Sequence, residues 1–262
     1  MRLVARLRGV GLEAVVPVAI LLVWGLWSAR ADNFFFPPLT DILASFRANW
    51  LFARLGPDVA PSLERLLAGY ALAVVFGVSL GVLIGSSRTA RQAAAPWVEF
   101  LRAIPPPVLA PFSILIFGIG PQFKVFLIAI GCIWPVLLNT IDGVRGIEPV
   151  LLETTASYRI GPLDRLRYVV LPAASPRIFA GMRSALSLSL ILMVISEMQA
   201  STDGIGFFVL QSQRSFAIPD MWSGILLLGL LGYASNALFV TVERRVLRWH
   251  RASQASALEQ AA

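Results

Sequence analysis

The chain is short of the side chains from which most active sites are built. Its 262 residues include one cysteine, Cys132, one histidine, His250, and one lysine, Lys124. A lone cysteine forms no internal disulfide, and a lone histidine in a basic tail gives no metal-ligand cluster. The sequence also has no Gly-x-x-x-x-Gly-Lys-Ser/Thr phosphate loop and no nucleophile motif. We therefore expect no metal site, no catalytic residues and no cofactor held by this chain.

Charged residues are scarce as well, at 14%, whereas apolar residues make up 57%. This composition excludes a single soluble domain. A helix needs about 20 residues to cross about 30 Å of hydrocarbon. We therefore expect an all-α membrane protein, with one domain over residues 1–262, six transmembrane helices and a flexible tail at 252–262. The spans are predicted at residues 10–28, 66–85, 103–119, 125–141, 178–195 and 221–242.

The first span could also be read as a secretory signal, because three arginines precede it and Ala29-Arg30-Ala31 resembles a cleavage site. Its 19 residues are long for the apolar part of a signal, which favours an uncleaved helix. The arginine distribution then sets the orientation, since short loops rich in basic residues stay in the cytoplasm. We expect both termini in the cytoplasm of a plasma (inner) membrane protein, with fourteen arginines inside and six basic residues outside: Arg30, Arg47, Arg54, Arg65, Lys124 and Arg214. The net charge of +7 is explained by this topology, so we expect no nucleic-acid partner.

A polar interruption separates the fourth and fifth predicted spans, at residues 145–177. Pro149 is suited to begin a helix, and Gly161 with Pro162 predicts its end and the start of a second, amphipathic helix that Pro172 stops. A cytoplasmic partner could bind this pair of helices. Alternatively, a basic amphipathic segment could lie on anionic membrane lipid.

The run ETTASYRIGPLDRLRYVVLP, residues 153–172, resembles the cytoplasmic EAA loop of the membrane-spanning subunits of ABC importers. The continuation AASPRIFAGMRSALSLSLILMVISEMQASTDGIGF, together with PSLERLLAGYALAVVFGVSLGVLIGSS and FLRAIPPPVLAPFSILIFGIG, is similar to the nitrate, taurine and aliphatic-sulfonate branch of that family. The match has departures: Thr154 and Thr155 replace two alanines, Arg159 occupies the usual glycine register, and Gly161 comes two residues later.

The resemblance implies a type I ABC importer permease fold and a mechanical role. Two copies, expected as a homodimer, would form the path for a small, anionic solute, and an external binding protein would deliver that solute. ATP and Mg would be bound by a separate ABC ATPase subunit. The expected contact with that subunit is the coupling loop, through Glu153, Thr154, Thr155, Gly161, Leu171 and Pro172.

Two further patterns lie within the spans. Gly69, Gly77, Gly81 and Gly85 form a stripe of small residues, which predicts close helix packing within the subunit or against a second copy. The run that contains Pro106 and Pro107 cannot continue a regular helix, and broken backbone at membrane depth is tolerated where it lines a cavity or is buried. The prediction is therefore a bend near the solute path, with a purely structural kink as the alternative.

Ionisable residues inside spans must be compensated. Glu99 and Arg102 stand three apart, which predicts an ion pair. Arg183 could either snorkel to the interface or border the solute path together with Ser187, and Glu197 is expected at the outer interface. A secondary transporter or channel acting alone is the main alternative function, and it would show paired intramembrane charges or inverted repeats; neither is evident in the sequence. An intramembrane enzyme or assembly factor would need the missing catalytic residues.

Overall fold

The computed structural model describes residues 15–16, 19, 22–28 and 33–249. Within this part the chain is helical and contains no strand. The expected tail at 252–262 and most of the first predicted span, 10–28, lie outside the described residues. The helices are α2 (Leu39–Ala48), α3 (Ala60–Gly85), α4 (Arg88–Arg102), α5 (Ala110–Phe117), α6 (Pro121–Arg145), α7 (Pro149–Ser157), α8 (Pro162–Arg165), α9 (Leu171–Gln199), α10 (Ile205–Arg214) and α11 (Ile218–Val246).

Four helical runs in the described part are long and apolar enough to cross a membrane. They are Leu55–Gly85, Pro121–Arg145, Pro162–Gln199 and Ile218–Val246. A fifth crossing is possible if α4 and the helical segment Pro106–Phe117, which meet at a bend of 81°, count as one span. Six spans are therefore not established by the described residues.

The span predicted at residues 103–119 is not a continuous helix in the structure. Pro105, Pro106 and Pro107 lack backbone N–H groups, so the chain there forms a short 3₁₀ helix over Pro106–Leu109 instead of continuing α4. The following helix, α5, has only 8 residues. The apolar segment that looked like one span is thus the second arm of a bent pair whose first arm is α4.

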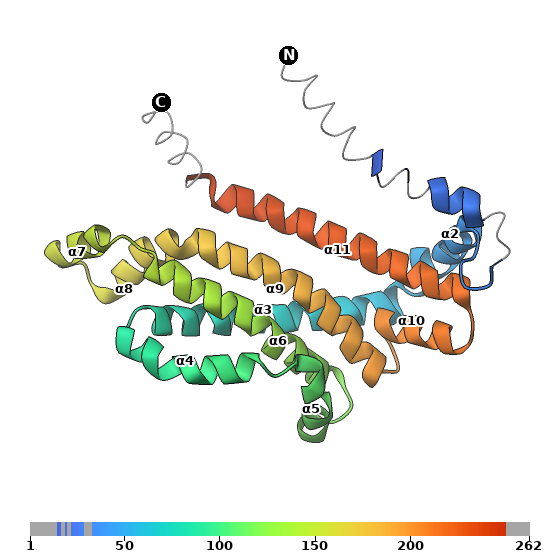
Figure 1. The fold of residues 1–262 in the computed structure, drawn as a ribbon, viewed down its shortest axis with the longest axis horizontal. Coiled ribbons are helices and arrows are strands. Elements are labelled where there is room, and N and C mark those ends of the chain that lie inside the picture. The colour runs from blue at the N-terminus through green and yellow to red at the C-terminus, as the bar shows by residue number, and fades with distance from the viewer. Residues whose placement is uncertain (1–14, 17–18, 20–21, 29–32, 250–262) are drawn as a thin grey trace, which may run out of the picture.

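The long helices lie side by side along the length of the molecule (Figure 1). α7 and α8 are at one end of this bundle, and α2 and α10 are at the other end. α3, α6 and α9 form its centre, around Ile128, Cys132, Val136 and Ala185. This arrangement separates the two ends of the bundle by the full length of the spans.

The glycine stripe of α3 faces α6. A Cβ atom placed at Gly69, Gly77, Gly81 or Gly85 would lie 2.6, 2.8, 2.5 or 2.9 Å from the Cβ of Ile128, Val136, Thr140 or Val144, respectively. The sequence offset between partners is constant, so the two helices run parallel and in register. Without side chains on this face of α3, the backbones approach closely, which is how helices associate in lipid.

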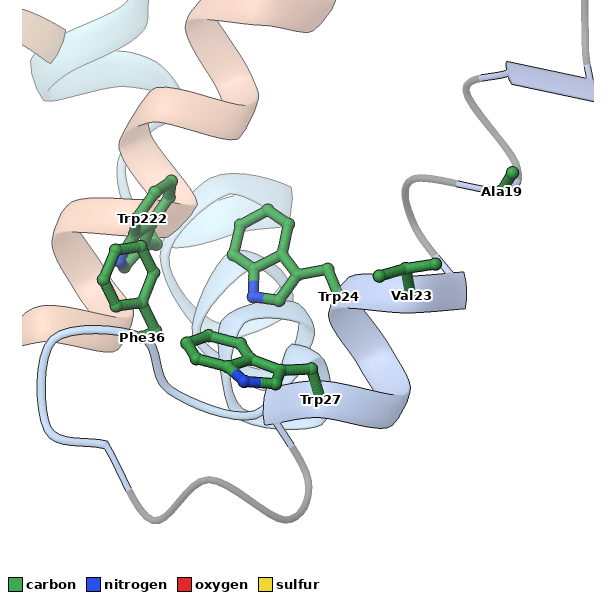
Figure 2. Close-up of a pocket in the computed structure, with 6 residues that line it drawn as sticks. All are labelled: Ala19, Val23, Trp24, Trp27, Phe36 and Trp222. Atoms are coloured by element: carbon green, nitrogen blue, oxygen red, sulfur yellow. The ribbon is translucent and has the colours of Figure 1, made fainter.

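Aromatic side chains hold the described N-terminal helical residues, 22–28, against the start of α11 (Figure 2). The rings of Trp24 and Trp222 are 5.0 Å apart, and Phe36 lies 6.0 Å from Trp222 and 5.7 Å from Trp27. They surround an apolar cavity of about 470 Å³. Because tryptophans gather at membrane–water interfaces, this cluster indicates that the start of α11 lies near one surface of the bilayer.

Candidate functional site

The segment between α6 and α9 forms two short helices at one end of the bundle. α7 begins at Pro149, as the sequence predicts, and ends at Ser157. Beyond it, the amide of Ile160 donates to the carbonyl of Thr155, and the amide of Arg159 donates to that of Ala156, both at 3.0 Å. These two bonds form a Schellman motif, which terminates a helix with one residue in the left-handed region.

Arg159 is that residue, with a φ of 52°. Gly161, by contrast, is extended, with a φ of −60° and a ψ of 154°, and precedes the first turn of α8. The expected role of Gly161 as the bend of the loop is therefore wrong, because the bend is completed two residues earlier, at Arg159. A non-glycine residue thus adopts left-handed backbone here, at the position that Arg159 occupies.

Pro172 does not stop the second helix, contrary to the sequence prediction. A π-helical turn over Leu166–Val170 joins α8 to α9, so the helical run continues from Pro162 to Gln199. The amide of Leu171 donates to the carbonyl of Leu166, five residues back. Pro172 has no N–H to donate to an earlier carbonyl. The wider π turn directly before it changes the hydrogen-bond register of the helix, so the helix continues past the proline. The α8 end of the loop is therefore continuous with a membrane-spanning helix.

Apolar and aromatic side chains cover the outer face of this segment. Val150, Tyr158, Leu163 and Tyr168 are 70%, 78%, 74% and 66% exposed. The side chains of Glu153 and Thr154 are exposed as well, and the Glu153 carboxylate has no partner in the described part of the chain. Of the other predicted loop residues, Thr155 is buried, and Leu171 and Pro172 are half-buried at the base of α9. Large apolar side chains exposed in this way are a feature of contact sites.

The predicted solute-path residues lie away from the loop, along the bundle. Arg183 and Ser187 are on an exposed face of α9, where Arg183 Nε donates to Asn236 Oδ1 of α11 at 3.3 Å. Pro106 and Pro107 are half-buried in the 3₁₀ helix, and Pro106 packs against Gly131 of α6. The structure therefore does not bring Arg183 and the prolines into one site: they belong to different surfaces of the bundle.

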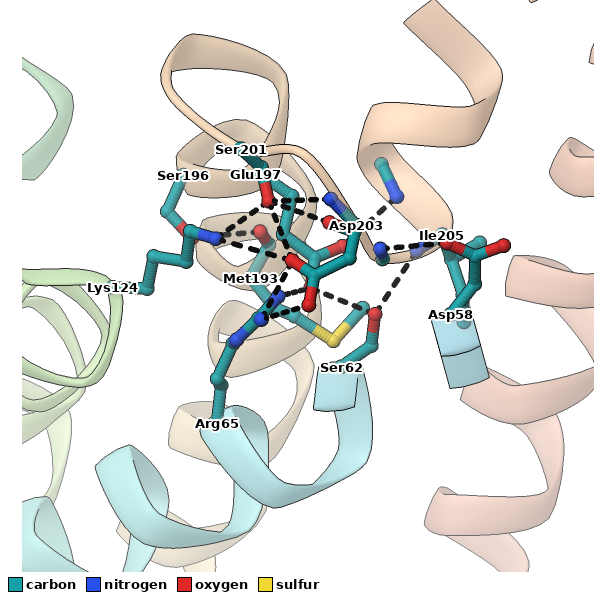
Figure 3. Close-up of polar contacts among 12 residues, drawn as sticks. Asp58, Ser62, Arg65, Lys124, Met193, Ser196, Glu197, Ser201, Asp203 and Ile205 are labelled. Carbon is teal, nitrogen blue, oxygen red and sulfur yellow. Dashed lines mark hydrogen bonds and ion pairs between the residues drawn. The ribbon is translucent and has the colours of Figure 1, made fainter. Parts of the chain in front are cut away.

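A buried network of charged groups at the opposite end was missed by the sequence analysis (Figure 3). Arg65 Nη1 lies 3.0 Å from Glu197 Oε1, and Arg65 Nη2 lies 2.8 Å from Asp203 Oδ1. Lys124 Nζ is 3.8 Å from the same Asp203 oxygen. Arg65, Lys124 and Glu197 are buried. Glu197, which was expected at the outer interface, is therefore enclosed by protein. The network ties α3, α6 and α9 together.

The carboxylate of Glu197 is also bound by neutral donors. Ser62 Oγ donates to Oε1 at 2.7 Å, and the backbone amide of Gly206, in the first turn of α10, donates to Oε2 at 2.9 Å. Asp203 lies in the loop before α10. Partial burial raises its pKa, but the hydrogen bond and the charge of Arg65 together have the larger, opposite effect, so its pKa is below the ordinary value. Arg65, Glu197 and Asp203 are thus paired with one another and hydrogen-bonded.

These residues were missed because the predicted span boundaries were too narrow. Arg65 lies one residue before the predicted span 66–85, and Glu197 lies two residues after the predicted span 178–195, whereas α3 begins at Ala60 and α9 ends at Gln199. The network contains charge pairs of the kind expected in a secondary transporter, so their apparent absence from the sequence no longer argues against that function. The family relationship decides between the two functions instead.

The fold resembles that of a solved importer. The structure titled as an inward-facing conformation of the MetNI methionine ABC transporter superposes with a TM-score of 0.65 at 20% sequence identity, over 72% of this chain and 94% of that chain. At this identity the likeness concerns the fold, which is that of a type I ABC importer permease.

Sequence relatives are closer. The nitrate import permease protein NrtB of Leptolyngbya laminosa is 35% identical over 88% of this chain and 86% of its own. The bicarbonate transport system permease protein CmpB of Synechococcus elongatus is 32% identical over 71% and 68%, and the taurine transport system permease protein TauC of Escherichia coli is 28% identical over 93% and 91%.

The family described as binding-protein-dependent transport system inner membrane component matches residues 73–248. This match includes α4 to α11 and thus the whole loop between α6 and α9. The chain therefore belongs to this family, the multi-pass inner-membrane permease subunits of ABC importers, which do not themselves hydrolyse ATP.

Proposed function

We propose that this permease imports a small solute with an anionic group, and that a separate ATPase subunit drives it by docking on the α7–α8 surface. We use this name for the exposed face that carries Val150, Tyr158, Leu163 and Tyr168. The exposed apolar side chains of this surface carry the proposal, because they lie on short helices at the end of the bundle and no other element of the described part covers them. The ATPase would bind ATP and Mg, since the sequence has no phosphate loop.

The mechanical link is supported by the continuity of the second helix. A push on α8 passes directly into α9 through the π-helical turn Leu166–Val170. α9 in turn packs along α6, where Gly181 faces Pro135 and Asn139. Docking and release of the ATPase would therefore tilt the central helices, and a second copy of the chain would complete the path as a homodimer. An external binding protein would deliver the solute.

The class of solute is suggested by the relatives, whose names specify nitrate, bicarbonate and taurine. Each of these solutes carries an anionic group. Arg183 and Ser187 remain candidate residues of the path, supported by their exposure on α9. The hydrogen bond of Arg183 to Asn236 orients its guanidinium along the surface shared with α11.

We expect the α7–α8 segment and both chain termini in the cytoplasm, on the strength of the arginine distribution. Ser157, at the end of α7, and Ser215, after α10, are both exposed and lie at opposite ends of the bundle. Cysteines at these positions in a Cys132→Ser background should be labelled from opposite faces of the membrane by an impermeant thiol reagent. Labelling of both from the outside would contradict this orientation.

Replacement of Glu153 by arginine should uncouple the ATPase. Glu153 is exposed outside the bilayer, so the fold should persist, whereas reversal of charge at a docking surface should reduce stimulated ATP hydrolysis by at least about tenfold. The measurement is ATP hydrolysis by the reconstituted complex with and without loaded binding protein. Asp142→Arg, a charge reversal at another exposed carboxylate, is the matched control and should retain stimulation. Full stimulation in Glu153→Arg would mean that the loop contact lies elsewhere.

A further inference from the structure

An exposed ion pair lies beside the break between α4 and the 3₁₀ helix. Arg102 Nε donates to Glu99 Oε2 at 3.0 Å, which agrees with the predicted pairing. The side chains are 44% and 63% exposed, respectively. Both line a cavity of about 530 Å³ whose other walls are Pro106, Trp134 and Leu188, with residues adjoining them on α6. The cavity is thus bounded by α4, the 3₁₀ helix, α6 and α9.

The cavity lies at the middle of the bundle. On α6 its lining runs from Gly131 to Leu138. At about 1.5 Å per residue, these residues lie about 15 and about 26 Å from the start of α6, a helix about 37 Å long. Leu188 is likewise near the centre of α9, between Leu171 and Gln199. The ion pair therefore faces the cavity at about the depth of the membrane centre.

Charged side chains at this depth do not face lipid. They face water, protein or a polar cavity, because hydrocarbon solvates neither partner. The adjacent backbone supports the same conclusion: Ala103 and Pro105 are exposed where α4 has ended, and broken backbone at membrane depth is found where it lines a cavity or is buried in protein. Two independent features thus indicate that this face lies against water or protein and not against lipid.

Arg102 has unused hydrogen-bonding capacity. Its guanidinium has five N–H donors, of which Glu99 Oε2 engages one on Nε and one on Nη2. Within the described part of the chain Nη1 has no acceptor, and it belongs to a group that lines the cavity. A planar guanidinium can bind two oxygens of a carboxylate or sulfonate side by side. An anionic group could therefore bind Arg102 while Glu99 turns away.

We propose that this cavity is a solute site of the permease, in which Arg102 binds the anionic group of the solute and Glu99 serves as its counterion when the site is empty. The proposal rests on the proposed function, in that it takes the solute to be anionic. It assigns different roles to the two members of the pair. If the ion pair were purely structural, neutralising either member would remove the same contact, so the two changes would have the same effect.

Charge-selective labelling tests these roles without knowledge of the solute. Ala103 is exposed and lines the cavity, so Ala103→Cys in the Cys132→Ser background places a thiol there. The permease–ATPase complex in lipid nanodiscs would be treated with anionic sulfonatoethyl methanethiosulfonate or with cationic trimethylammonioethyl methanethiosulfonate. We expect labelling by the anionic reagent, and the ratio of anionic to cationic labelling rates is the measured quantity. Absence of labelling by both reagents would overturn the aqueous site.

Neutralising the two charges should move this ratio in opposite directions. Arg102→Gln should lower it by about tenfold and Glu99→Gln should raise it, because each change removes one sign of charge from the cavity. Asp142→Asn is the matched control: Asp142 forms an i,i+3 pair with Arg145 near the end of α6, with side chains 64% and 57% exposed. This control should leave the ratio unchanged. An equal ratio in wild type, Arg102→Gln and Glu99→Gln would overturn the proposal.

Uptake separates this site from the importer function itself. With wild-type complex in proteoliposomes, ATP-dependent uptake of labelled taurine, nitrate or bicarbonate is expected for at least one probe, with about tenfold slower uptake in Arg102→Gln and retained uptake in the control Asp142→Asn. ATP-dependent uptake that is unchanged in Arg102→Gln would overturn the site but leave the importer intact. Absence of ATP-dependent uptake of every probe by wild type would overturn the anionic solute class, and with it this site.

Discussion

Replacing Gly81 with alanine is expected to destabilise the protein by about 1–3 kcal/mol, as overpacking of a close contact does. The added Cβ would lie 2.5 Å from the Cβ of Thr140 and 3.0 Å from the carbonyl oxygen of Leu137. The second contact is with backbone, so α3 and α6 must move apart to relieve it. Because the other glycines of the stripe face α6 in the same register, the separation would loosen the packing along the length of α3.

Gly229 in α11 provides the control, because no atom of the described residues lies within 4 Å of a Cβ added there. Alanine at this helical position should stabilise by up to about 1 kcal/mol, the usual gain over glycine in a helix. Gly81→Ala is thus expected to lower the stability of the protein, and Gly229→Ala is expected to raise it. Thermal unfolding of the purified permease complex in detergent measures both. Equal shifts for the two variants would show that the stripe does not mediate tight packing.

Replacing Arg65 with glutamine is expected to cost about 3–5 kcal/mol, the range for breaking a buried ion pair from one side. The substitution leaves Glu197, which is 0% exposed, and Asp203 without their shared cation. Neutral donors from Ser62 and Gly206 still bind Glu197, but they carry no compensating charge. The ion pair that joins Asp203 to α3 should be lost as a result.

The double variant Arg65→Gln with Glu197→Gln separates pairing from packing. It removes both charges, so it should be more stable than the sum of the two single changes by about 1 kcal/mol or more. Arg145→Gln is the control, because Arg145 and its partner Asp142 are exposed and such pairs contribute little. Chemical or thermal unfolding of the complex in detergent provides the measurement. Additive losses would mean that Arg65 and Glu197 act independently.

Much of the central bundle could be predicted from sequence. Small residues at every fourth position of α3, four glycines and Ala73, predicted close packing, and Pro149 marked the start of α7. These features follow from local chemistry: a missing side chain leaves room for a neighbour, and a proline ring presets the first turn of a helix. They need no knowledge of the remaining fold.

The prolines predicted a bend, but the size of the bend and the buried network could not be predicted in the same way. Residues 103–119 are apolar enough to cross a membrane, and the sequence does not indicate that the chain turns by 81° to form a bent pair with α4. Likewise Arg65, Lys124 and Glu197 are far apart in sequence, and only the packing of α3, α6 and α9 brings them together. The left-handed backbone of Arg159 shows a third limit, because a residue type that rarely adopts this conformation is held in it by the Schellman hydrogen bonds.

The central claim is that an ATPase docks on the α7–α8 surface, and site-directed cross-linking tests it most directly. A photo-reactive residue would be introduced at Tyr158, the most exposed side chain of this surface, and at Tyr233, which is 77% exposed on α11. In the permease–ATPase complex, Tyr158 should cross-link to the ATPase subunit, whereas Tyr233 should not. Cross-linking of the ATPase from Tyr233 but not from Tyr158 would contradict the account.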